Sequence, residues 1–332
     1  MWFEDLTGFS EESPEQVRAN LVLSDSVITS TVNGRKMAVG RLETPSLAEI
    51  RAMIRNSAVA RGPLTLGEVV GDVQKLHLDP GSQGAFFQAA SQFNLLEMVS
   101  PEVTPEAGVG RYEYDRTQGP ACAIAAGAGT LFRNYFAAVN GQVGQSAENQ
   151  IDCLRDVGAL LGNQNEQMWA MRNGYALASG PGLQAIREKL AARDDAQRDV
   201  LRGALRIGIQ SETEVTLNGT GHLVTQAYCS ALPVAYSAHA PELWRDFARL
   251  ILEAAYEATL GAAILNYANT GNNRVYLTML GGGAFGNARD WILSSISRAA
   301  ETFADYPLDV KMVSYHGTNP ELGKLRVSMS KG

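Results

Sequence analysis

A run of four glycines within six residues is the clearest candidate for a ligand-binding segment: Gly281, Gly282, Gly283, Ala284, Phe285, Gly286 and then Asn287. It follows an apolar, β-rich segment, 274–280, and precedes residues with helical spacing of apolar side chains. Glycine lets backbone N–H groups come close to an anion, and a helix N-terminus favours negative charge. We therefore predict an anion cradle, with Asn287 capping the following helix. A tight strand-to-helix turn that binds nothing is the alternative.

A second loop-to-helix junction, residues 115–129, combines polar residues with a helix of unusually small side chains. Pro120 suits the first turn of that helix, because the N–H that proline lacks would have no partner there. Small side chains allow close approach either of a ligand or of another stretch of backbone. Both interpretations stay open.

Two groups of carboxylates could supply acid–base chemistry. Glu212 and Glu214 alternate along the extended segment 205–216, and period-two spacing would place both on one polar face of a strand. A strand face exposed to solvent shows the same alternation, so that interpretation stays open as well. Asp115, with Glu113 before it, lies just upstream of the small-residue helix. An ordinary polar loop is the alternative there.

Several common kinds of site do not fit the sequence. The four histidines and three cysteines are dispersed, without the HExxH or CxxC spacing of metal sites, so we predict no metal centre. The glycine run is neither GxGxxG nor a P-loop ending in GK[ST]. It therefore favours neither a dinucleotide-dependent dehydrogenase nor a nucleoside triphosphatase, and we expect no cofactor.

The composition predicts a folded protein, since 45% of its 332 residues are hydrophobic and 19% are charged. Its net charge of −7 leaves no general basic field for a nucleic acid, so backbone amides would have to hold an anionic ligand locally. No apolar stretch of about 18 residues occurs, and the acidic start does not resemble a secretion signal. We expect a cytoplasmic protein, or an effector exported by a non-Sec route, with neither membrane nor nucleic acid as partner. Its oligomeric state stays open.

Two regions differ in their pattern of elements. Residues 1–65 are predicted as a small α+β extension, with a hairpin turn at Asn33-Gly34 and a capped helix after Ser46. Over 66–332, strands alternate with longer helices, as in an α/β layer fold. Within that domain, about 139–204 is predicted as a mostly helical insertion, either a solvated surface or a cap over a site. We expect strands at 73–78, 85–90, 205–216, 223–231, 274–280 and 309–315, a connector at 61–67, and helices after 120, over 241–266 and after 287.

The order of these segments resembles the macrodomain, an ADP-ribose-binding α/β/α module, over residues 70–317. Where the family has an Asn-Ala-Ala-Asn strand end, this chain has Gln88-Ala89-Ala90-Ser91. Residues 282–286 stand in the place of the second phosphate loop, and 208–216 with 223–233 match the paired strands that precede the penultimate helix. The resemblance implies a three-layer α/β/α fold around a mixed sheet.

The resemblance also implies roles for individual residues. Residues 281–286 would wrap the diphosphate of ADP-ribose, with Phe285 near the distal ribose. Gln88, Gln92 and Asn94 would lie near that ribose, and Thr117, Gln118 and Gly119 would form the first phosphate loop. The chain departs from the family because that loop lacks successive glycines and because Ala121 stands where mono-ADP-ribosyl hydrolases carry an aspartate. The paired glutamates of poly(ADP-ribose) glycohydrolases are also absent from this helix, so neither mechanism carries over.

We therefore predict a hydrolase that removes ADP-ribose from modified protein side chains by carboxylate-assisted attack of water on an N-glycosidic bond. The chain looks more similar to divergent bacterial macrodomains, effectors among them, that act on ADP-ribosylated arginine. Arginine is accordingly the first linkage to consider, because a carboxylate binds a guanidinium in bidentate fashion. The candidate catalytic residues are Glu212, Glu214 and Asp115. A non-catalytic ADP-ribose-binding module is the alternative, and a structural or partner-binding protein without nucleotide affinity is a third class.

Overall fold

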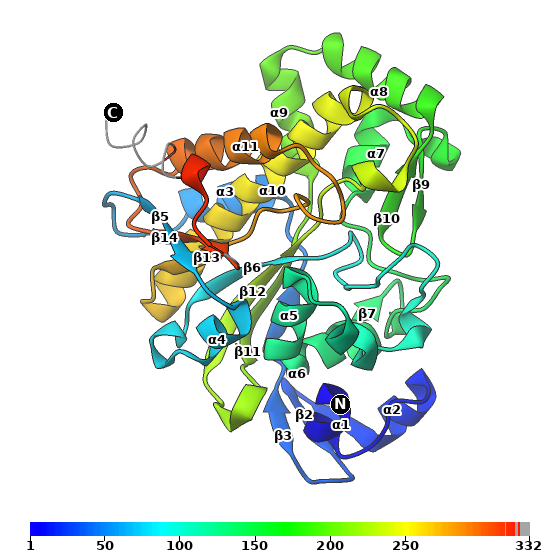
Figure 1. The fold of residues 1–332 in the computed structure, drawn as a ribbon, viewed down its shortest axis with the longest axis vertical. Coiled ribbons are helices and arrows are strands. Elements are labelled where there is room, and N and C mark those ends of the chain that lie inside the picture. The colour runs from blue at the N-terminus through cyan, green and yellow to red at the C-terminus, as the bar shows by residue number, and fades with distance from the viewer. Residues whose placement is uncertain (316, 323–324, 326–332) are drawn as a thin grey trace.

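A seven-stranded mixed sheet forms the centre of the computed structural model, which describes residues 1–315, 317–322 and 325. In chain order its strands are β4 (Arg41–Glu43), β5 (Thr65–Val70), β6 (Phe86–Ala90), β11 (Gly208–Glu214), β12 (Leu223–Cys229), β13 (Arg274–Leu277) and β14 (Asp309–Ser314). Across the sheet the order is β4-β11-β12-β6-β13-β14-β5. The strand β11 is antiparallel to both neighbours, whereas the five strands from β12 to β5 are parallel. The carboxyl ends of these five strands therefore meet at one end of the sheet (Figure 1).

Helices cover both faces of this sheet (Figure 1). One layer contains α3 (Leu47–Arg55), α10 (Pro241–Thr270) and α11 (Arg289–Thr302), and the other contains α4 (Val73–Leu78), α5 (Gln118–Ala125) and α6 (Gly127–Leu131). The central strand β6 contacts both layers: Gln88 donates to Thr259 of α10, whereas Phe87 stacks on His77 of α4 with ring centres 3.7 Å apart. Successive side chains of a strand point to opposite faces. The expected three-layer α/β/α class with a mixed sheet is therefore confirmed.

Two predicted elements are wrong. Residues 73–78, expected as a strand, form α4, because the Asp72 side chain accepts the N–H of Gln74 at 2.8 Å and caps a helix there. A segment of six residues is too short for its apolar spacing to distinguish a strand from a helix. Residues 61–67, expected as a connector, lead into the edge strand β5, which pairs with β14. The strands expected at 85–90, 205–216, 223–231, 274–280 and 309–315 are confirmed with shorter bounds.

The N-terminal residues form α1 (Trp2–Thr7), α2 (Pro14–Asn20) and a three-stranded sheet of β1 (Leu21–Ser24), β2 (Val27–Ser30) and β3 (Lys36–Ala38). The hairpin turn at Asn33-Gly34 is confirmed, since it joins β2 to β3. The capped helix after Ser46 is also confirmed, because the side chains of Ser46 and Glu49 each accept the other's backbone N–H at the start of α3. The strand β4 nevertheless pairs with β11, so the extension contributes to the central sheet. A domain boundary at residue 65 stays a prediction.

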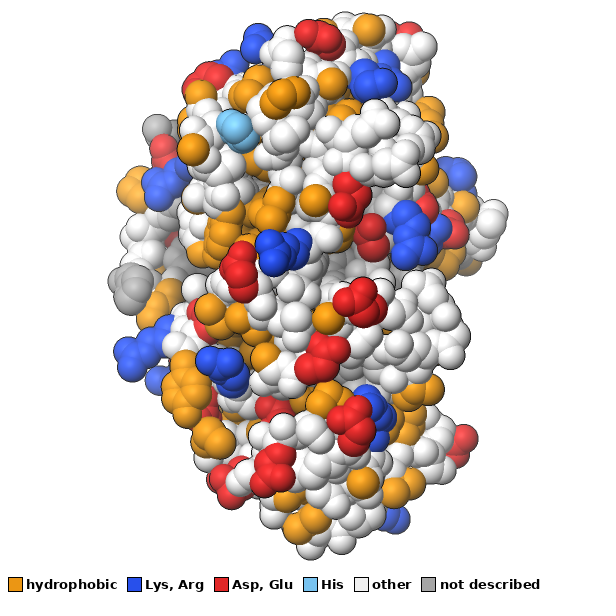
Figure 2. Space-filling view, turned by 90° about the vertical axis from the view of Figure 1, so that its right-hand side faces the viewer, with side chains coloured by type: hydrophobic (Ala, Val, Ile, Leu, Met, Phe, Trp, Pro, Cys, Tyr) orange, Lys and Arg blue, Asp and Glu red, His pale blue; other side chains and the backbone are white. Residues whose placement is uncertain are grey.

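The insertion contains two β-hairpins beside its helices, so the mostly helical prediction is wrong in part. Its elements are β7 (Ala138–Val139), β8 (Gln142–Val143), α7 (Arg155–Leu161), β9 (Trp169–Arg172), β10 (Tyr175–Ala178), α8 (Gly180–Ala191) and α9 (Asp195–Ala204). Both hairpins turn on Asn-Gly pairs with positive φ, Asn140-Gly141 and Asn173-Gly174, which is a strong hairpin signal. Figure 2 shows the side that carries the insertion, where acidic and basic side chains are interspersed without a single-sign patch.

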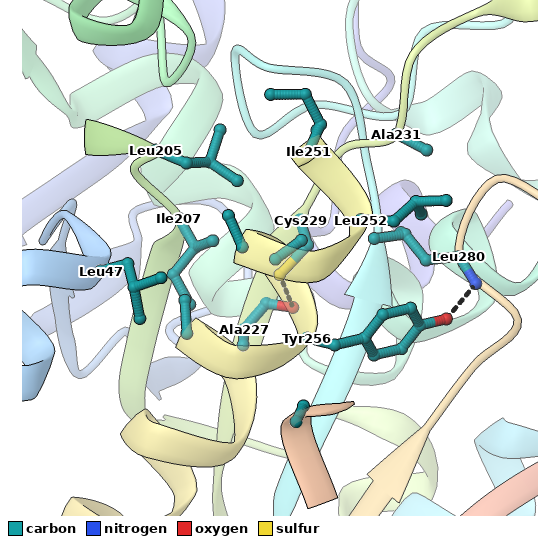
Figure 3. Packing of buried hydrophobic residues seen from close by; sticks show 14 of the residues in the cluster. Leu47, Leu205, Ile207, Ala227, Cys229, Ala231, Ile251, Leu252, Tyr256 and Leu280 are labelled. Carbon is teal, nitrogen blue, oxygen red and sulfur yellow. Dashed lines mark hydrogen bonds between the residues drawn. The ribbon is translucent and has the colours of Figure 1, made fainter. Parts of the chain in front are cut away.

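The main core lies between α10 and the sheet, as Figure 3 shows. Ile251, Leu252 and Tyr256 of α10 pack near Ala227 and Cys229 of β12, and each of these side chains is at most 1% exposed. The sequence of β6 is a continuous buried run instead of an alternating one, because both faces of the strand are covered. Close-packed interiors resist deformation. The loops that leave these strands therefore start from fixed positions.

Candidate functional site

A cavity of about 390 Å³ opens at the carboxyl ends of β6, β12 and β13. This is the end of a parallel sheet at which ligands of open α/β folds bind. Segments far apart in the sequence line it, namely residues 90–92, 97–99, 115, 117–120, 175, 231, 236, 278–281 and 283–285. The glycine run and the small-residue junction, which the sequence singled out separately, therefore meet in one place.

The glycine run forms a loop whose backbone donors are free to bind a ligand. Among the described residues, none accepts the N–H of Gly281, Gly283, Ala284 or Phe285, and all four residues line the cavity. Successive unpaired N–H groups in a turn make a concave anion site. Gly281 has φ +72°, and a Cβ there would lie 2.4 Å from that of Ala231, so this position needs glycine. The loop supports the predicted anion cradle in composition and geometry.

The predicted helix cap at Asn287 is wrong. The helix α11 begins at Arg289, and its N-cap residue is Ala288. Asn287 instead donates through Nδ2 to the carbonyl of Leu232 at 2.8 Å, and its backbone N–H bonds the carbonyl of Gly281 at 2.9 Å. These bonds close the loop on itself before the helix starts. Gly282, Gly286 and Asn287 accordingly do not line the cavity, and the free donors belong to the loop and not to the helix N-terminus.

Tyr256 of α10 holds the start of the glycine loop. Its hydroxyl donates to the carbonyl of Thr278 at 2.7 Å. It also accepts the N–H of Leu280 at 2.8 Å, a bond that Figure 3 shows. Burial raises the pKa of this phenol, so the hydroxyl keeps its proton and both bonds persist. The longest helix of the core thereby fixes where the loop leaves β13.

The N-terminus of α5 forms a second set of donors. The N–H groups of Gln118 and Gly119, in the first turn, have no intrahelical acceptor. The helix approaches β6 so closely that a Cβ on Gly119 would lie 1.9 Å from the carbonyl oxygen of Ala90. The Gln118 side chain ties the two together, since it accepts the N–H of Ala90 at 2.9 Å and donates to the carbonyl of Gln88 at 2.7 Å. Thr117, Gln118 and Gly119 all line the cavity, next to Ala90.

Glu97 is the residue of this site that sequence reasoning missed. Its side chain lines the cavity, is only 2% exposed, and neither carboxyl oxygen has a hydrogen-bond partner among the described residues. Burial raises its pKa to about 8; the positive charge of Arg133 lowers it and the negative charge of Asp115 raises it further. The group is therefore a protonated carboxylic acid at neutral pH. A single glutamate within the apolar run 95–98 is the available signal, because such a residue is buried with its neighbours.

A strained loop presents Glu97 to the cavity. Leu95 has φ +66°, which is costly for a bulky residue and is found where the surroundings enforce it. Two of the predicted ribose-binding residues stabilise this loop: Gln92 accepts the N–H of Met98 at 2.8 Å, and Asn94 accepts that of Leu96 at 3.1 Å. Gln92 also lines the cavity, whereas Asn94 does not.

The third predicted ribose-binding residue, Gln88, points away from the cavity. It is fully buried, donates to Thr259 on α10 at 3.0 Å, and accepts the N–H of Thr278 at 3.3 Å. Because it lies in the middle of β6, its side chain packs against the α10 layer instead of following the strand end. We infer a structural role for Gln88 and Asn94.

Arg133 lies fully buried beneath the Glu97 loop. Its Nε donates to the carbonyl of Leu95 at 3.0 Å and its Nη2 donates to Thr130 at 3.0 Å. The guanidinium also lies 3.5 Å from the ring centre of Tyr228, a cation–π contact. Arg133 thus holds the carbonyl of Leu95 in place. Its positive charge lowers the pKa of Glu97 and offsets part of the effect of burial.

Three aromatic rings form one wall of the cavity. Tyr175, Tyr236 and Phe285 have ring centres 5.1, 5.3 and 5.5 Å apart in pairs, so they pack against each other. Tyr175 comes from β10 of the insertion and donates from its hydroxyl to the carbonyl of Met98 at 2.6 Å. The insertion therefore borders the cavity, in agreement with the interpretation of this segment as a cap.

The predicted acid pair Glu212 and Glu214 lies elsewhere. A bulge in β11 breaks the expected alternation, since Gln210 and Thr213 are both buried and Glu212 has φ +54°. Glu212 is exposed in another cavity, which the amino ends of β6 and β12 line. Glu214 accepts the backbone N–H of Ala38 at 2.9 Å. Of the three predicted acids, only Asp115 lines the cavity, where it accepts the N–H of Thr117 at 2.9 Å.

Metal ligands do not gather at this site. Within residues 1–315, 317–322 and 325, no group of three or more His, Cys, Asp or Glu side chains is placed to hold a metal ion. None of the helices in this part of the chain is both long and apolar enough to cross a membrane.

Comparison with known proteins gave weak structural matches. No family model and no curated protein matches the chain. It is similar to the poly(ADP-ribose) glycohydrolase of Deinococcus radiodurans in complex with ADP-ribose, at 12% identity and a TM-score of 0.46, over 88% of this chain and 94% of that one. It is also similar to that of Thermomonospora curvata, at 12% identity and a TM-score of 0.43, over 96% and 95%. Similarity of this size does not by itself assign an activity.

Proposed function

We propose that this protein binds ADP-ribose in the cavity and hydrolyses the glycosidic bond that joins ADP-ribose to a modified protein side chain. The observation that carries the proposal is the buried, protonated Glu97 in a cavity that also presents two sets of unpaired backbone N–H groups. The resemblance of the sequence to macrodomains supports the same ligand.

The two sets of donors suit a diphosphate. Among the residues that the structure describes, no lysine or arginine lines the cavity, and the whole chain carries a net charge of −7. Anionic groups would therefore be held by the first turn of α5 and by the loop at 281–285, whose partial positive charges are fixed by the backbone. A diphosphate spans two such sites, whereas a single carboxylate would occupy only one.

The aromatic wall suits a nucleobase. Because Tyr175, Tyr236 and Phe285 contact each other, they present a continuous surface and leave no slot between them. Stacking of a base on an aromatic side chain contributes on the order of 1–3 kcal/mol. Because Phe285 belongs to the glycine loop, an adenine on this wall would lie beside that loop and its diphosphate. This placement replaces the distal ribose that the resemblance implied near Phe285.

The two acids that line the cavity suit hydrolysis. Glu97 would donate its proton to the leaving nitrogen or oxygen while the bond from this atom to C1″ of the ribose breaks. A water molecule would form the new bond to C1″ and pass its proton to Asp115. This assignment replaces Glu212 and Glu214 as candidate catalytic residues and retains Asp115.

Arginine is the linkage that we propose first. A guanidinium leaving group is positively charged, so the negative charge of Asp115 attracts it. The absence of lysine and arginine from the cavity lining avoids repulsion of that group. Glutamate- and serine-linked ADP-ribose lack this charge, so we expect them to be poorer substrates.

Calorimetric titration with ADP-ribose followed by release assays tests the proposal. We expect binding, release of ADP-ribose from an arginine-modified protein, and loss of that release with retained binding in Glu97→Gln. Glu148→Gln is the matched control, because Glu148 is exposed on the insertion outside the cavity. Absence of ADP-ribose binding would refute the whole proposal. Binding without release from arginine-, glutamate- or serine-linked proteins would leave a binding module, and release from poly(ADP-ribose) alone would exclude a protein side chain as the acceptor.

A further inference from the structure

We infer that Glu11, in the N-terminal extension, is a positioning residue for Glu97: its carboxylate fills a nest of backbone N–H groups and holds the segment that fixes Glu97. This inference rests on the proposed function insofar as Glu97 acts there as the acid. It assigns to residues 1–13 a part in the site, although none of them lines the cavity.

The carboxylate of Glu11 occupies an internal anion site. Its Oε1 accepts the N–H of Val109 at 3.0 Å and the hydroxyl of Tyr135, and its Oε2 accepts the N–H of Gly110 at 2.6 Å. A Cβ on Gly108, which has φ +81°, would lie 2.3 Å from Oε2, and one on Gly110 would lie 2.8 Å from it. Consecutive N–H groups that converge on one anion define a nest. Here a side chain of the same protein supplies the anion.

Trp2 binds the carbonyl groups of the same segment. The indole N–H donates to the carbonyls of Val109 and Gly110 at 3.3 and 3.2 Å. The backbone N–H of Trp2 donates to Glu113 at 3.1 Å. Residues 108–110 are buried, so these bonds replace water that cannot reach them. The extension therefore fixes both the donors and the acceptors of this turn.

The turn is joined directly to Glu97. It continues into the short helix Gly110–Tyr114, in which Tyr112 is 2% exposed and accepts the backbone N–H of Glu97 through its hydroxyl at 3.0 Å. Burial raises the pKa of this phenol well above its usual value, and the charge of Glu97 raises it further, so the hydroxyl stays neutral. The same segment then leads to Asp115. Both acids of the proposed site thus depend on where residues 108–112 lie.

Packing connects the same parts independently of these bonds. Leu96 and Met98, the neighbours of Glu97 on either side, belong to a buried cluster that also contains Phe3 and Leu6 of the extension. All four side chains are at most 4% exposed. The backbone around Glu97 is therefore anchored in the hydrophobic core of the extension, while its carboxyl group faces the cavity.

Loss of the Glu11 carboxylate should reduce turnover without weakening ligand binding. Two buried N–H groups and the Tyr135 hydroxyl would lose their acceptor, and residues 108–112 would shift with the Glu97 backbone. A misplacement of about 1 Å costs on the order of 100-fold in rate. ADP-ribose affinity, which depends on the glycine loop and on α5, should stay unchanged. A formate ion fits the vacated nest, so formate should restore turnover in Glu11→Ala.

The experiment compares Glu11→Ala with Glu12→Ala, whose side chain is exposed and makes no hydrogen bond among the described residues. Turnover, ADP-ribose affinity by calorimetry, formate rescue, and hydrogen exchange of the Glu97 amide are measured on the full chain. We expect a loss of about 100-fold in kcat, unchanged affinity, rescue by formate and faster exchange at Glu97, in Glu11→Ala only. Glu11→Gln, which keeps the shape but places a donor against the nest, should show a smaller loss and no rescue.

Two results would overturn the inference. One is a Glu11→Ala variant with wild-type turnover and unchanged exchange at Glu97. The other is parallel loss of turnover and of ADP-ribose affinity, which would indicate general disruption. Failure of the proposed function is recognised separately, because wild-type protein would then show no release at all. Faster exchange at Glu97 in Glu11→Ala would support the positioning role even in that case.

Discussion

Replacing Glu97 by glutamine should stabilise the protein by an amount that grows with pH. Burial raises the pKa of Glu97 from 4.5 to about 8, so the folded chain binds this proton more tightly than the unfolded chain does. The resulting stability is fully present below about pH 4.5 and is lost as the pH rises through about 8. Glutamine resembles the protonated acid in shape and cannot ionise, so it removes this dependence.

The magnitude follows from the difference between the two pKa values. Each pH unit in that window corresponds to about 1.4 kcal/mol, which amounts to roughly 5 kcal/mol when the full window has been crossed. At pH 7 the expected gain of Glu97→Gln over wild type is about 3 kcal/mol. Few substitutions to a polar residue at a buried position stabilise a protein by this much. Glu97→Gln would be an exception because a functional site can retain a group that is unfavourable for folding.

Denaturant unfolding of wild type and Glu97→Gln, from about pH 5 to about pH 9, measures this difference. The two free energies of unfolding should be nearly equal at the acidic end and diverge toward the basic end. Glu148→Gln should follow wild type throughout, because that side chain is exposed. If wild type and Glu97→Gln gave parallel curves, Glu97 would not be a buried ionisable group, and its assignment as the acid would be wrong.

Three further predictions concern the same site. Turnover should fall as the pH rises through about 8, because Glu97 then loses the proton that it donates. A pH profile of kcat checks this, and a profile without a fall near that pH would contradict the assignment of Glu97 as the acid. Gly119→Ala would bring a Cβ to 1.9 Å from the carbonyl oxygen of Ala90, so we expect the free energy of unfolding to fall by about 1–3 kcal/mol and ADP-ribose binding to be lost. In Gly283→Ala the new Cβ meets no atom within 4 Å, so this variant should keep its stability. Tyr256→Phe leaves a buried carbonyl without its donor, so we expect the free energy of unfolding to fall by about 1–3 kcal/mol and ADP-ribose to bind more weakly in a titration. Full affinity would contradict the role of this hydroxyl in holding the loop.

The sequence was sufficient for features that depend on neighbouring residues. The strand β6, the hairpin turn at Asn33-Gly34 and the capping box at Ser46 and Glu49 all follow from local preferences, and the structure confirms them. The glycine run could be recognised as a turn between a strand and a helix for the same reason, and its binding of an anion stays a prediction. The two Asn-Gly pairs of the insertion carry an equally local signal, so its hairpins too are predictable from the sequence.

The carboxylates that line the cavity could be identified only from the three-dimensional fold. Glu212 and Glu214 have the alternation of an acid pair, but a bulge in β11 breaks it, and the antiparallel direction of that strand takes its end away from the cavity. Glu97 has no motif around it, and its pKa is set by burial among segments that are distant in the sequence. Local patterns determine which elements form, because propensity and capping act over a few residues. Burial, register and the meeting of strand ends involve the whole chain, so the chemistry of the site follows from the fold.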